Sequence, residues 1–208
     1  MKSTGISVLV ASMVASFAPA ASAVVLTFDD LVSNIFFSAD YQGFRFGNNV
    51  AATNDWFVDP GPSPLYPRAS VATAIGFNPL VPVGNIDQLE SMPITMANGA
   101  DFFLAGAFFS GYATDSIGGT ALVSFKLYNN NALVGTTGTL TPNHVAAVFL
   151  STGALAAIAI DAFTVVGPAP YFLMDNLNVT PVPEPATFGM MALGLVGMGA
   201  MVRRQKKE

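Results

Sequence analysis

The chain has 208 residues, of which 52% are hydrophobic and 10% charged, with 8 basic against 13 acidic side chains. An acidic balance without a basic patch argues against nucleic-acid binding, which requires Lys and Arg to neutralise phosphates. The absence of cysteine excludes disulfides, a thiol nucleophile and a thiolate metal site. The counts of Gly (19), Pro (14) and Phe (17) favour short strands and turns over a helical bundle.

The N-terminus has the pattern of a secretory signal peptide. Lys2 supplies a thin positive start, residues 6–17 are apolar, and Ala21-Ser22-Ala23 forms a small-residue cleavage site. We therefore predict a signal peptide over residues 1–23 and a mature chain that begins at Val24. The alternative is an uncleaved N-terminal anchor, although the apolar run is short for a bilayer.

Residues 24–180 show no 3.6-residue apolar period, and short β-rich runs recur instead. In chain order, the predicted strands cover residues 24–28, 43–47, 102–109, 122–128, 133–140, 145–150, 157–166 and 171–179. Phe44 and Phe46 alternate and are expected on one face, and Asn129-Asn130-Asn131 suits a hairpin turn because Asn tolerates positive φ. About eight to ten strands predict an all-β body, a two-sheet β-sandwich of jelly-roll type.

The segment from Trp56 to Pro82 is rich in proline and predicts a long irregular surface loop, a kind of segment that is often functional. Its aromatic side chains Trp56, Phe57 and Tyr66 are the candidates for stacking on sugar rings, and Tyr41 and Arg45 are candidates to join them. The alternative is that Trp56 fills the core, since aromatic side chains contribute large buried areas.

Two acidic pairs are candidate metal ligands. Asp29-Asp30 ends the first predicted strand, and Asp175-Asn176 lies within the last. The first and last strands of a sandwich often lie side by side, and calcium takes oxygen ligands of this kind. The sequence thus predicts a structural calcium ion at these four residues. The alternative is that they cap turns by accepting bonds from backbone amides.

Catalytic residues are not predicted. The body contains one glutamate, Glu90, whereas glycoside hydrolysis generally uses two carboxylates across one cleft. His144 is the one histidine of the chain, so a zinc site built on several histidines is excluded, and it is expected to be exposed in a turn. No Gly-x-Ser-x-Gly nucleophile elbow is present. The body is therefore predicted not to be an enzyme.

The C-terminal segment reads as a membrane helix with a basic stop. Residues 186–202 carry no charge, and at roughly 1.5 Å per residue a helix there spans about 25 Å. The basic residues that follow place the C-terminus in the cytoplasm by the positive-inside rule; they are Arg203, Arg204, Lys206 and Lys207. Val182-Pro183-Glu184-Pro185 precedes the helix, and its prolines favour an extended, accessible segment.

A Pro-Glu-Pro box, an apolar helix and a basic tail in this order resemble the sorting signal of the PEP-CTERM proteins of Gram-negative bacteria, here over residues 181–208. The resemblance implies that exosortase, an integral-membrane cysteine transpeptidase-like enzyme, recognises the box and processes the tail. It also implies an intermediate anchored in the inner membrane and then a place at the cell surface or outside the cell, in bacteria that make extracellular polysaccharide and biofilm. The alternative is an ordinary membrane anchor with a Pro-rich neck.

The body resembles other PEP-CTERM bodies and the sandwiches of carbohydrate-binding modules. The resemblance rests on Leu26-Thr27-Phe28-Asp29-Asp30-Leu31, on the hairpin from Phe125 to Val134, and on Phe172-Leu173-Met174-Asp175-Asn176-Leu177. It implies polysaccharide binding and supports the structural calcium ion. We expect an exported, non-enzymatic surface or matrix protein that binds polysaccharide. A secreted polysaccharide-active enzyme and a self-associating structural matrix protein are the alternatives.

Overall fold

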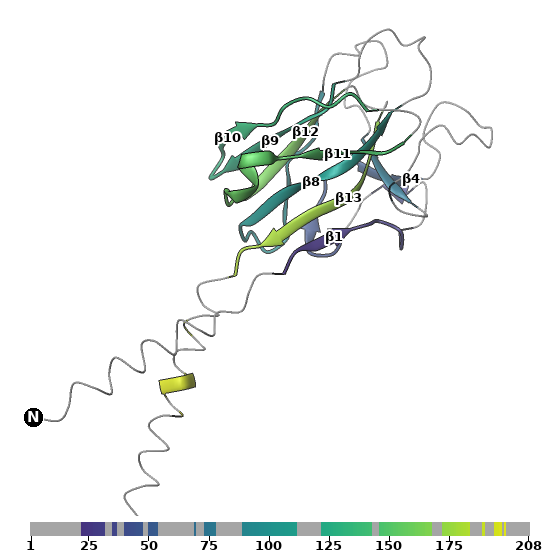
Figure 1. The fold of residues 1–208 in the computed structure, drawn as a ribbon. Coiled ribbons are helices and arrows are strands. Elements are labelled where there is room, and N and C mark those ends of the chain that lie inside the picture. Colours follow the sequence, from purple (N-terminus) through teal and green to yellow (C-terminus); the bar gives the residue numbers. More distant parts are fainter. Residues whose placement is uncertain are drawn as a thin grey trace, which may run out of the picture. The chain divides into compact units, whose positions relative to one another are not determined.

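The structure is a computed structural model that describes residues 22–31, 35–36, 40–47, 50–53, 69, 73–77, 89–111, 122–142, 146–167, 172–183, 189, 194–196 and 198. Ala23–Pro181 forms one compact unit. Within it, two antiparallel sheets stack as a sandwich (Figure 1). The predicted all-β, two-sheet architecture is confirmed, while its finer assignment to the jelly rolls stays a prediction.

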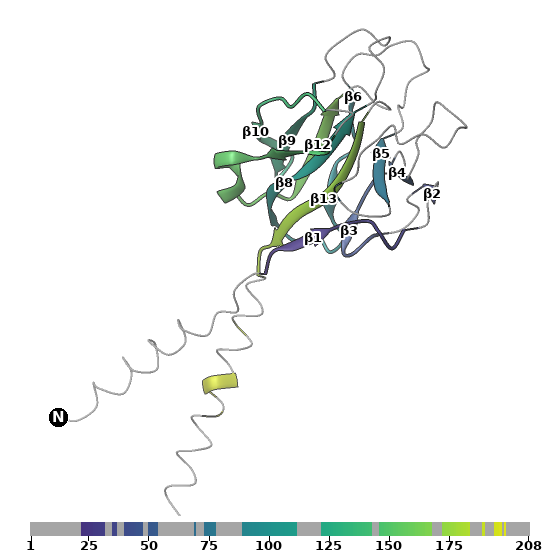
Figure 2. The same ribbon diagram turned by 45° about the vertical axis from the view of Figure 1, so that its right-hand side comes forward.

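One sheet has seven strands. Its order is β11 (Val148–Ser151), β8 (Phe102–Gly111), β13 (Phe172–Pro181), β5 (Ala74–Phe77), β4 (Val50–Thr53) and β2 (Ile35–Phe36), with β1 (Val24–Leu26) also paired to β13. The long strands β8 and β13 form its centre (Figure 2). The register between them shifts after Asp175, and at this bulge Gly106 has a φ of 145°. A Cβ on Gly106 would collide with the carbonyl oxygen of Leu150, so this position requires glycine.

The other sheet has six strands. Its order is β10 (Ala132–Thr136), β9 (Ser124–Asn129), β12 (Ala162–Gly167), β7 (Ile94–Met96) and β3 (Phe44–Arg45), with β6 (Leu89–Glu90) paired to β12. Strands β9 and β10 are joined by Asn130 and Asn131, whose φ values are 51° and 62°. Two successive residues with positive φ form a turn whose twist matches that of the two flanking strands. The predicted asparagine turn is therefore confirmed.

The first and last strands lie side by side, as the sequence predicted. Strand β1 pairs antiparallel with β13, with Val24 opposite Val179 and Leu26 opposite Leu177 (Figures 1 and 2). The chain therefore enters and leaves the sandwich on neighbouring strands of the same sheet.

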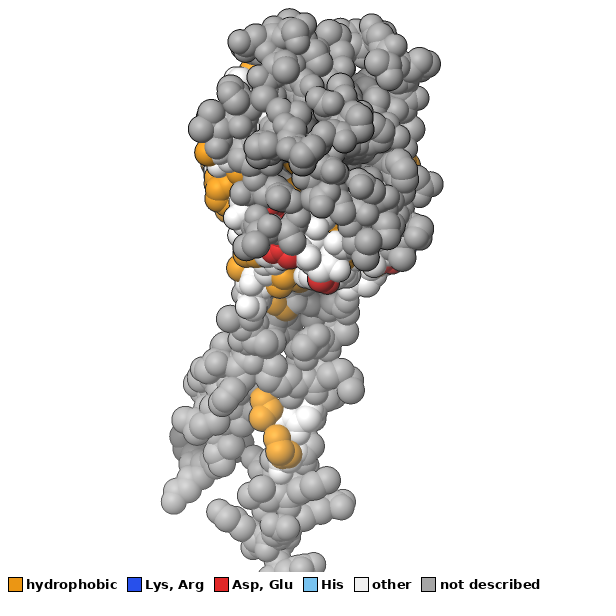
Figure 3. All heavy atoms as spheres, turned by 90° about the vertical axis from the view of Figure 1, so that its right-hand side faces the viewer, with side chains coloured by type: hydrophobic (Ala, Val, Ile, Leu, Met, Phe, Trp, Pro, Cys, Tyr) orange, Lys and Arg blue, Asp and Glu red, His pale blue; other side chains and the backbone are white. Residues whose placement is uncertain are grey.

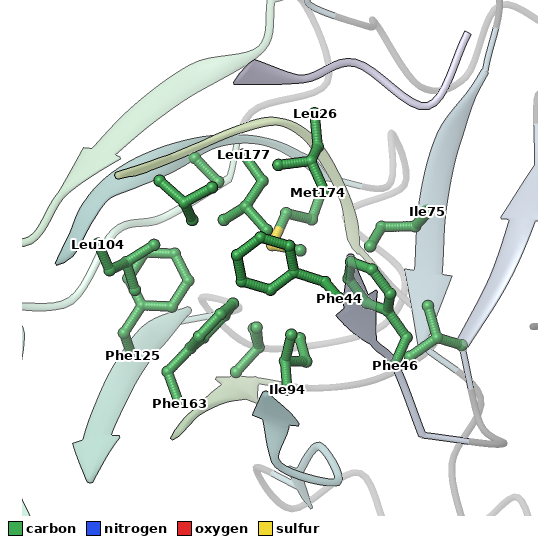
Figure 4. Packing of buried hydrophobic residues seen from close by; sticks show 14 of the residues in the cluster. Leu26, Phe44, Phe46, Ile75, Ile94, Leu104, Phe125, Phe163, Met174 and Leu177 are labelled. Carbon is green, nitrogen blue, oxygen red and sulfur yellow. The ribbon is translucent and has the colours of Figure 1, made fainter. Parts of the chain in front are cut away.

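The core lies between the two sheets and is largely aromatic. Side chains from both sheets point toward one another there (Figure 4). Phe163 of β12 contacts Phe125 at a centroid distance of 5.7 Å and Phe102 at 6.1 Å, both edge to face. Phe44 and Phe46 are both buried, which confirms their predicted common face. Each buried aromatic ring removes a large apolar area from water, which explains why a chain without disulfides forms this fold.

The sequence located the long strands and some of the short ones. The strand predicted over 157–166 begins only at Ala162, because a 3₁₀ helix, η2 (Gly153–Ala157), precedes it. The predicted irregular loop from Trp56 to Pro82 contains β5, whose four residues are all buried. The short strands β1, β3 and β11 fall in predicted runs, whereas β2, β4, β6 and β7 were not predicted, because so few residues rarely show a clear alternation.

Most of the predicted export and sorting signals of the chain lie outside the described residues. This holds for the signal peptide up to Ala21, for most of the helix predicted over 186–202, and for the basic tail. Gly189, residues 194–196 and Met198 are helical. In the part of the chain that the structure describes, no helix is both long enough and apolar enough to cross a membrane.

Candidate functional site

The outer face of the six-stranded sheet is polar. Along β9 and β12 the inward side chains are buried, as in Phe125, Leu127 and Phe163. The alternate positions on these strands turn the other way, and they include Lys126 and Tyr128. This alternation is the pleat of a sheet with one buried and one solvated face.

This face carries a groove of about 800 Å³. Strands β3, β6, β7, β9 and β12 all contribute to it, together with the turns that follow β7 and β9. Its lining residues are Arg45, Glu90, Ser91, Pro93, Thr95, Met96, Ala97, Asn98, Gly99, Tyr128, Asn131, Asp161, Ala162 and Thr164. We call this region the sheet groove.

Glu90 lines the sheet groove and bonds three neighbouring side chains. Its Oε1 pairs with Lys126 Nζ at 2.8 Å and accepts hydrogen bonds from Tyr128 Oη at 2.9 Å and Thr164 Oγ1 at 3.4 Å. The bond from Lys126 lowers the pKa of Glu90 below its ordinary value, although partial burial acts in the opposite direction. The same bond raises the pKa of Lys126. This carboxylate is therefore ionised and fixed at neutral pH.

Arg45 stands at the β3 side of the groove. Its Nε and Nη2 donate to the two carboxylate oxygens of Asp40 at 3.1 and 3.2 Å. This two-point contact raises the pKa of Arg45 and fixes the plane of its guanidinium. Arg45 stays exposed, with 62% of its side chain accessible, so the guanidinium is available to a ligand.

The asparagine turn closes the opposite end of the groove. Asp161 Oδ2 accepts a hydrogen bond from the Asn130 amide at 2.7 Å, and Asn129 Nδ2 donates to the Ala159 carbonyl at 3.1 Å. These bonds fix the hairpin against the start of β12. Asn131 and Asp161 are thereby held at the groove wall.

The sheet groove thus combines an aromatic ring with oriented hydrogen-bonding groups, which suits a ligand bearing several hydroxyl groups. The sequence singled out only Arg45 from its walls. Alternation on the predicted strand over 122–128 places Lys126 and Tyr128 on one face, and this pattern could have indicated them as residues of one site. Strands β6 and β7, which complete the groove, were missed, and Glu90 could not be placed.

The predicted calcium ligands are engaged within the protein. Asp29 Oδ1 accepts a bond from the Thr73 amide at 3.3 Å, and Asp30 Oδ1 accepts one from Tyr41 Oη at 2.6 Å. Asp175 is buried, and its Oδ1 accepts the amide of Asn176 at 2.7 Å. The bonds to Asp29 and Asp175 fit the alternative that these carboxylates accept from backbone amides, whereas Asp30 accepts from a side-chain hydroxyl.

Asn176 is the exception in this group. It lies at the β13 bulge with a φ of 46°, and its Oδ1 is buried without a hydrogen-bond partner among the described residues. However, no three His, Cys, Asp or Glu side chains gather there, or elsewhere in the described chain, in a group that could hold a metal ion. The calcium site stays a prediction. A melting temperature that is the same in EDTA and in calcium would remove it.

The remaining predicted site residues lie mostly outside the described part of the chain. Trp56 and Tyr66 of the proposed stacking loop do, as does His144. In the sorting box, Val182 and Pro183 are described and lie directly after β13, whereas Glu184 and Pro185 are not.

Comparison with known proteins identifies the C-terminal segment. Residues 181–205 match the model of the PEP-CTERM protein-sorting motif, which confirms the resemblance of the Pro-Glu-Pro box, apolar helix and basic tail. No curated protein matches the chain. Proteins with this motif are exported and sorted to the cell surface by exosortase, so the motif implies that destination for this chain.

Proposed function

Because the chain ends in a PEP-CTERM sorting motif, we propose that it is a non-enzymatic protein of the cell surface or extracellular matrix whose sandwich binds polysaccharide in the sheet groove. The observation that carries this proposal is the arrangement of Tyr128, Glu90 and Lys126 on the open face of the six-stranded sheet. The resemblance of the body to carbohydrate-binding modules with jelly-roll folds is consistent with it.

The chemistry of the groove fits a sugar. The C–H face of a pyranose packs on a flat aromatic surface, and Tyr128 offers one whose hydroxyl is fixed by Glu90. Sugar hydroxyls both donate and accept, and the groove offers carboxylate acceptors in Glu90 and Asp161 and a guanidinium donor in Arg45. Side chains that are already held by neighbours lose little entropy when a ligand binds.

The charge pattern favours a neutral polysaccharide over a polyanion. Among the described residues, the two cations of this face are already paired with carboxylates, Lys126 with Glu90 and Arg45 with Asp40. Residues 24–182 carry three basic against eleven acidic side chains, so the field of the body repels an anionic polymer.

The state of Glu90 supports a binding role over hydrolysis. A general acid for glycoside cleavage needs a raised pKa, so that it is protonated near neutral pH. Lys126 instead lowers the pKa of Glu90. We therefore propose that the sheet groove holds sugar without cleaving it.

Affinity gel electrophoresis tests the binding. The probes are the neutral and acidic fractions of extracellular polysaccharide from the producing bacterium, separated by anion exchange. We expect the neutral fraction to retard the exported protein, Tyr128→Ala to weaken retention about tenfold, and Tyr128→Phe to retain most of it because the ring remains. Retention of Tyr128→Ala at the wild-type level would overturn the assignment to this groove.

Two further arms separate the alternatives. If the Trp56 and Tyr66 segment binds the sugar, Trp56→Ala loses retention while Tyr128→Ala keeps it. If the protein is an enzyme, new reducing ends or double bonds appear in the polysaccharide, and Glu90→Gln abolishes them. We expect neither result.

A further inference from the structure

One long stretch of this acidic body has no charged residue. From residue 127 to residue 160 the sequence contains no Asp, Glu, Lys or Arg. The stretch supplies the end of β9 and all of β10, β11 and η2. The other residues between 24 and 182 carry all three basic and all eleven acidic side chains of that segment.

The stretch forms an edge of each sheet. Strand β10 ends the six-stranded sheet and pairs with β9, and β11 ends the seven-stranded sheet and pairs with β8. No described strand pairs with the outer side of either. The helix η2 follows β11 and packs on β10, where a Cβ at Gly135 would lie 2.9 Å from Leu155 Cδ2. Figures 1 and 2 both place η2 beside β10. We call β10, η2 and β11 the neutral side.

Large apolar side chains are exposed on the neutral side. Leu133 of β10 is 55% exposed, and Phe149 of β11 and Ile158 after η2 are each 39% exposed. The Phe149 ring contacts Phe108 of the neighbouring strand at a centroid distance of 5.1 Å and extends the apolar surface across the sheet. Figure 3 views the body from the side of β4, away from β10 and η2, and the charged side chains coloured on that face are acidic.

We propose that the neutral side is a self-association surface and that its partner is a second copy of this chain. Two copies with the same excess of acidic residues repel each other except where charge is absent, so this side is where they approach at least cost. Its edges lack the Lys, Glu and Pro residues that block pairing between sheets, and β10 carries only a bulge between Leu133 and Gly135.

The geometry of an edge strand also favours pairing with the same strand of a second copy of the chain. An edge strand presents unpaired N–H and C=O groups, and antiparallel pairing with the same strand about a two-fold axis satisfies both copies alike. A charged partner, whether a polyanion or a basic protein, would find no opposite charge here. Sorting to the cell surface concentrates copies of the chain and promotes the encounter.

Sedimentation velocity of the exported protein over a wide range of concentration tests the proposal. We expect a reversible dimer that Leu133→Lys and Phe149→Lys each weaken about tenfold or more, because each places like charges opposite one another. The matched control is Met92→Lys, which adds the same charge at a side chain that is 41% exposed but lies outside the neutral side. Unchanged melting temperatures would show that the variants fold.

Salt provides an independent readout. The body repels its copy while the contact itself is uncharged, so raising the ionic strength should strengthen the dimer. A monomer at every concentration, or a dimer weakened equally by Met92→Lys and Leu133→Lys, would overturn the proposal. So would a monomer that floats with phosphatidylcholine vesicles through Phe149, which would assign this side to lipid. None of these outcomes depends on polysaccharide binding.

Discussion

The Tyr41 hydroxyl donates a 2.6 Å hydrogen bond to Asp30 Oδ1 and accepts one from Gln42 Nε2 at 2.9 Å. Tyr41 is buried, and its ring stacks on Phe28 at a centroid distance of 5.3 Å. Asp30 follows β1 of the seven-stranded sheet, whereas Tyr41 precedes β3 of the six-stranded sheet. The bond therefore ties the two sheets at the start of the body, and it uses an oxygen that the sequence had assigned to calcium.

Tyr41→Phe should lower the free energy of unfolding by about 1 kcal/mol, because it removes a hydrogen bond to a carboxylate while keeping the stacked ring. Burial and the bond to Asp30 both raise the pKa of Tyr41. This contribution is complete below the ordinary tyrosine pKa of 10.0 and is lost as the pH rises further. Urea unfolding measures the difference. Tyr128→Phe is the control, since its bond to Glu90 is exposed and should contribute less. Equal losses of unfolding free energy in both variants would contradict a stabilising role of the Tyr41–Asp30 bond between the sheets.

The Glu90–Lys126 pair should make the protein less stable in acid. The folded protein lowers the pKa of Glu90 below 4.5, so its contribution is present above that value and is lost as the pH falls through the folded pKa. We expect Glu90→Gln to flatten the decline in melting temperature below about pH 4.5 and to have a small effect at neutral pH, because the pair is partly exposed. If the melting temperatures of the wild type and Glu90→Gln fall equally with decreasing pH, other carboxylates determine the stability in acid.

The asparagine turn should tolerate glycine and resist β-branched residues. Asn131 has a φ of 62°, a region that costs most side chains roughly 1–2 kcal/mol. Asn131→Val is therefore expected to lower the free energy of unfolding by about that amount, whereas Asn131→Gly should be close to neutral. Both variants remove the same amide from the sheet groove. If sugar retention falls only in Asn131→Val, the turn conformation matters for binding more than the amide does.

The sorting motif predicts a processed chain. We expect the intact mass of the released protein to correspond to a start at Val24 and an end near Pro183-Glu184-Pro185, with any surplus mass marking an attachment. Glu184→Ala should trap the precursor in the inner membrane with its basic tail intact. Normal release of Glu184→Ala would count against recognition of the box, and a wild-type chain found only in the inner membrane with Arg203 still present would indicate a plain anchor.

The sequence by itself determined the features that depend on local chemistry. The prolines around Glu184 and the basic tail form a contiguous pattern that matches the sorting motif, and the small residues before Val24 form a contiguous pattern whose cleavage stays a prediction. Local patterns also indicated the long strands, where alternation repeats often enough to be seen, and the hairpin at Asn130 and Asn131, whose φ values depend on the residue type.

Only the tertiary structure decided where chemistry from distant segments meets. Glu90 bonds Lys126 and Thr164 because β6 and β9 both pair with β12, and the sequence around β6 shows no alternation of apolar and polar residues. For Asp29, Asp30 and Asp175, the sequence predicted a shared site that the structure does not show. The sequence correctly placed the first and last strands side by side, but pairing fixes backbones and not side chains. A turn lies at Phe28 and a bulge after Asp175, and there Asp29 and Asp175 accept bonds from the Thr73 and Asn176 amides.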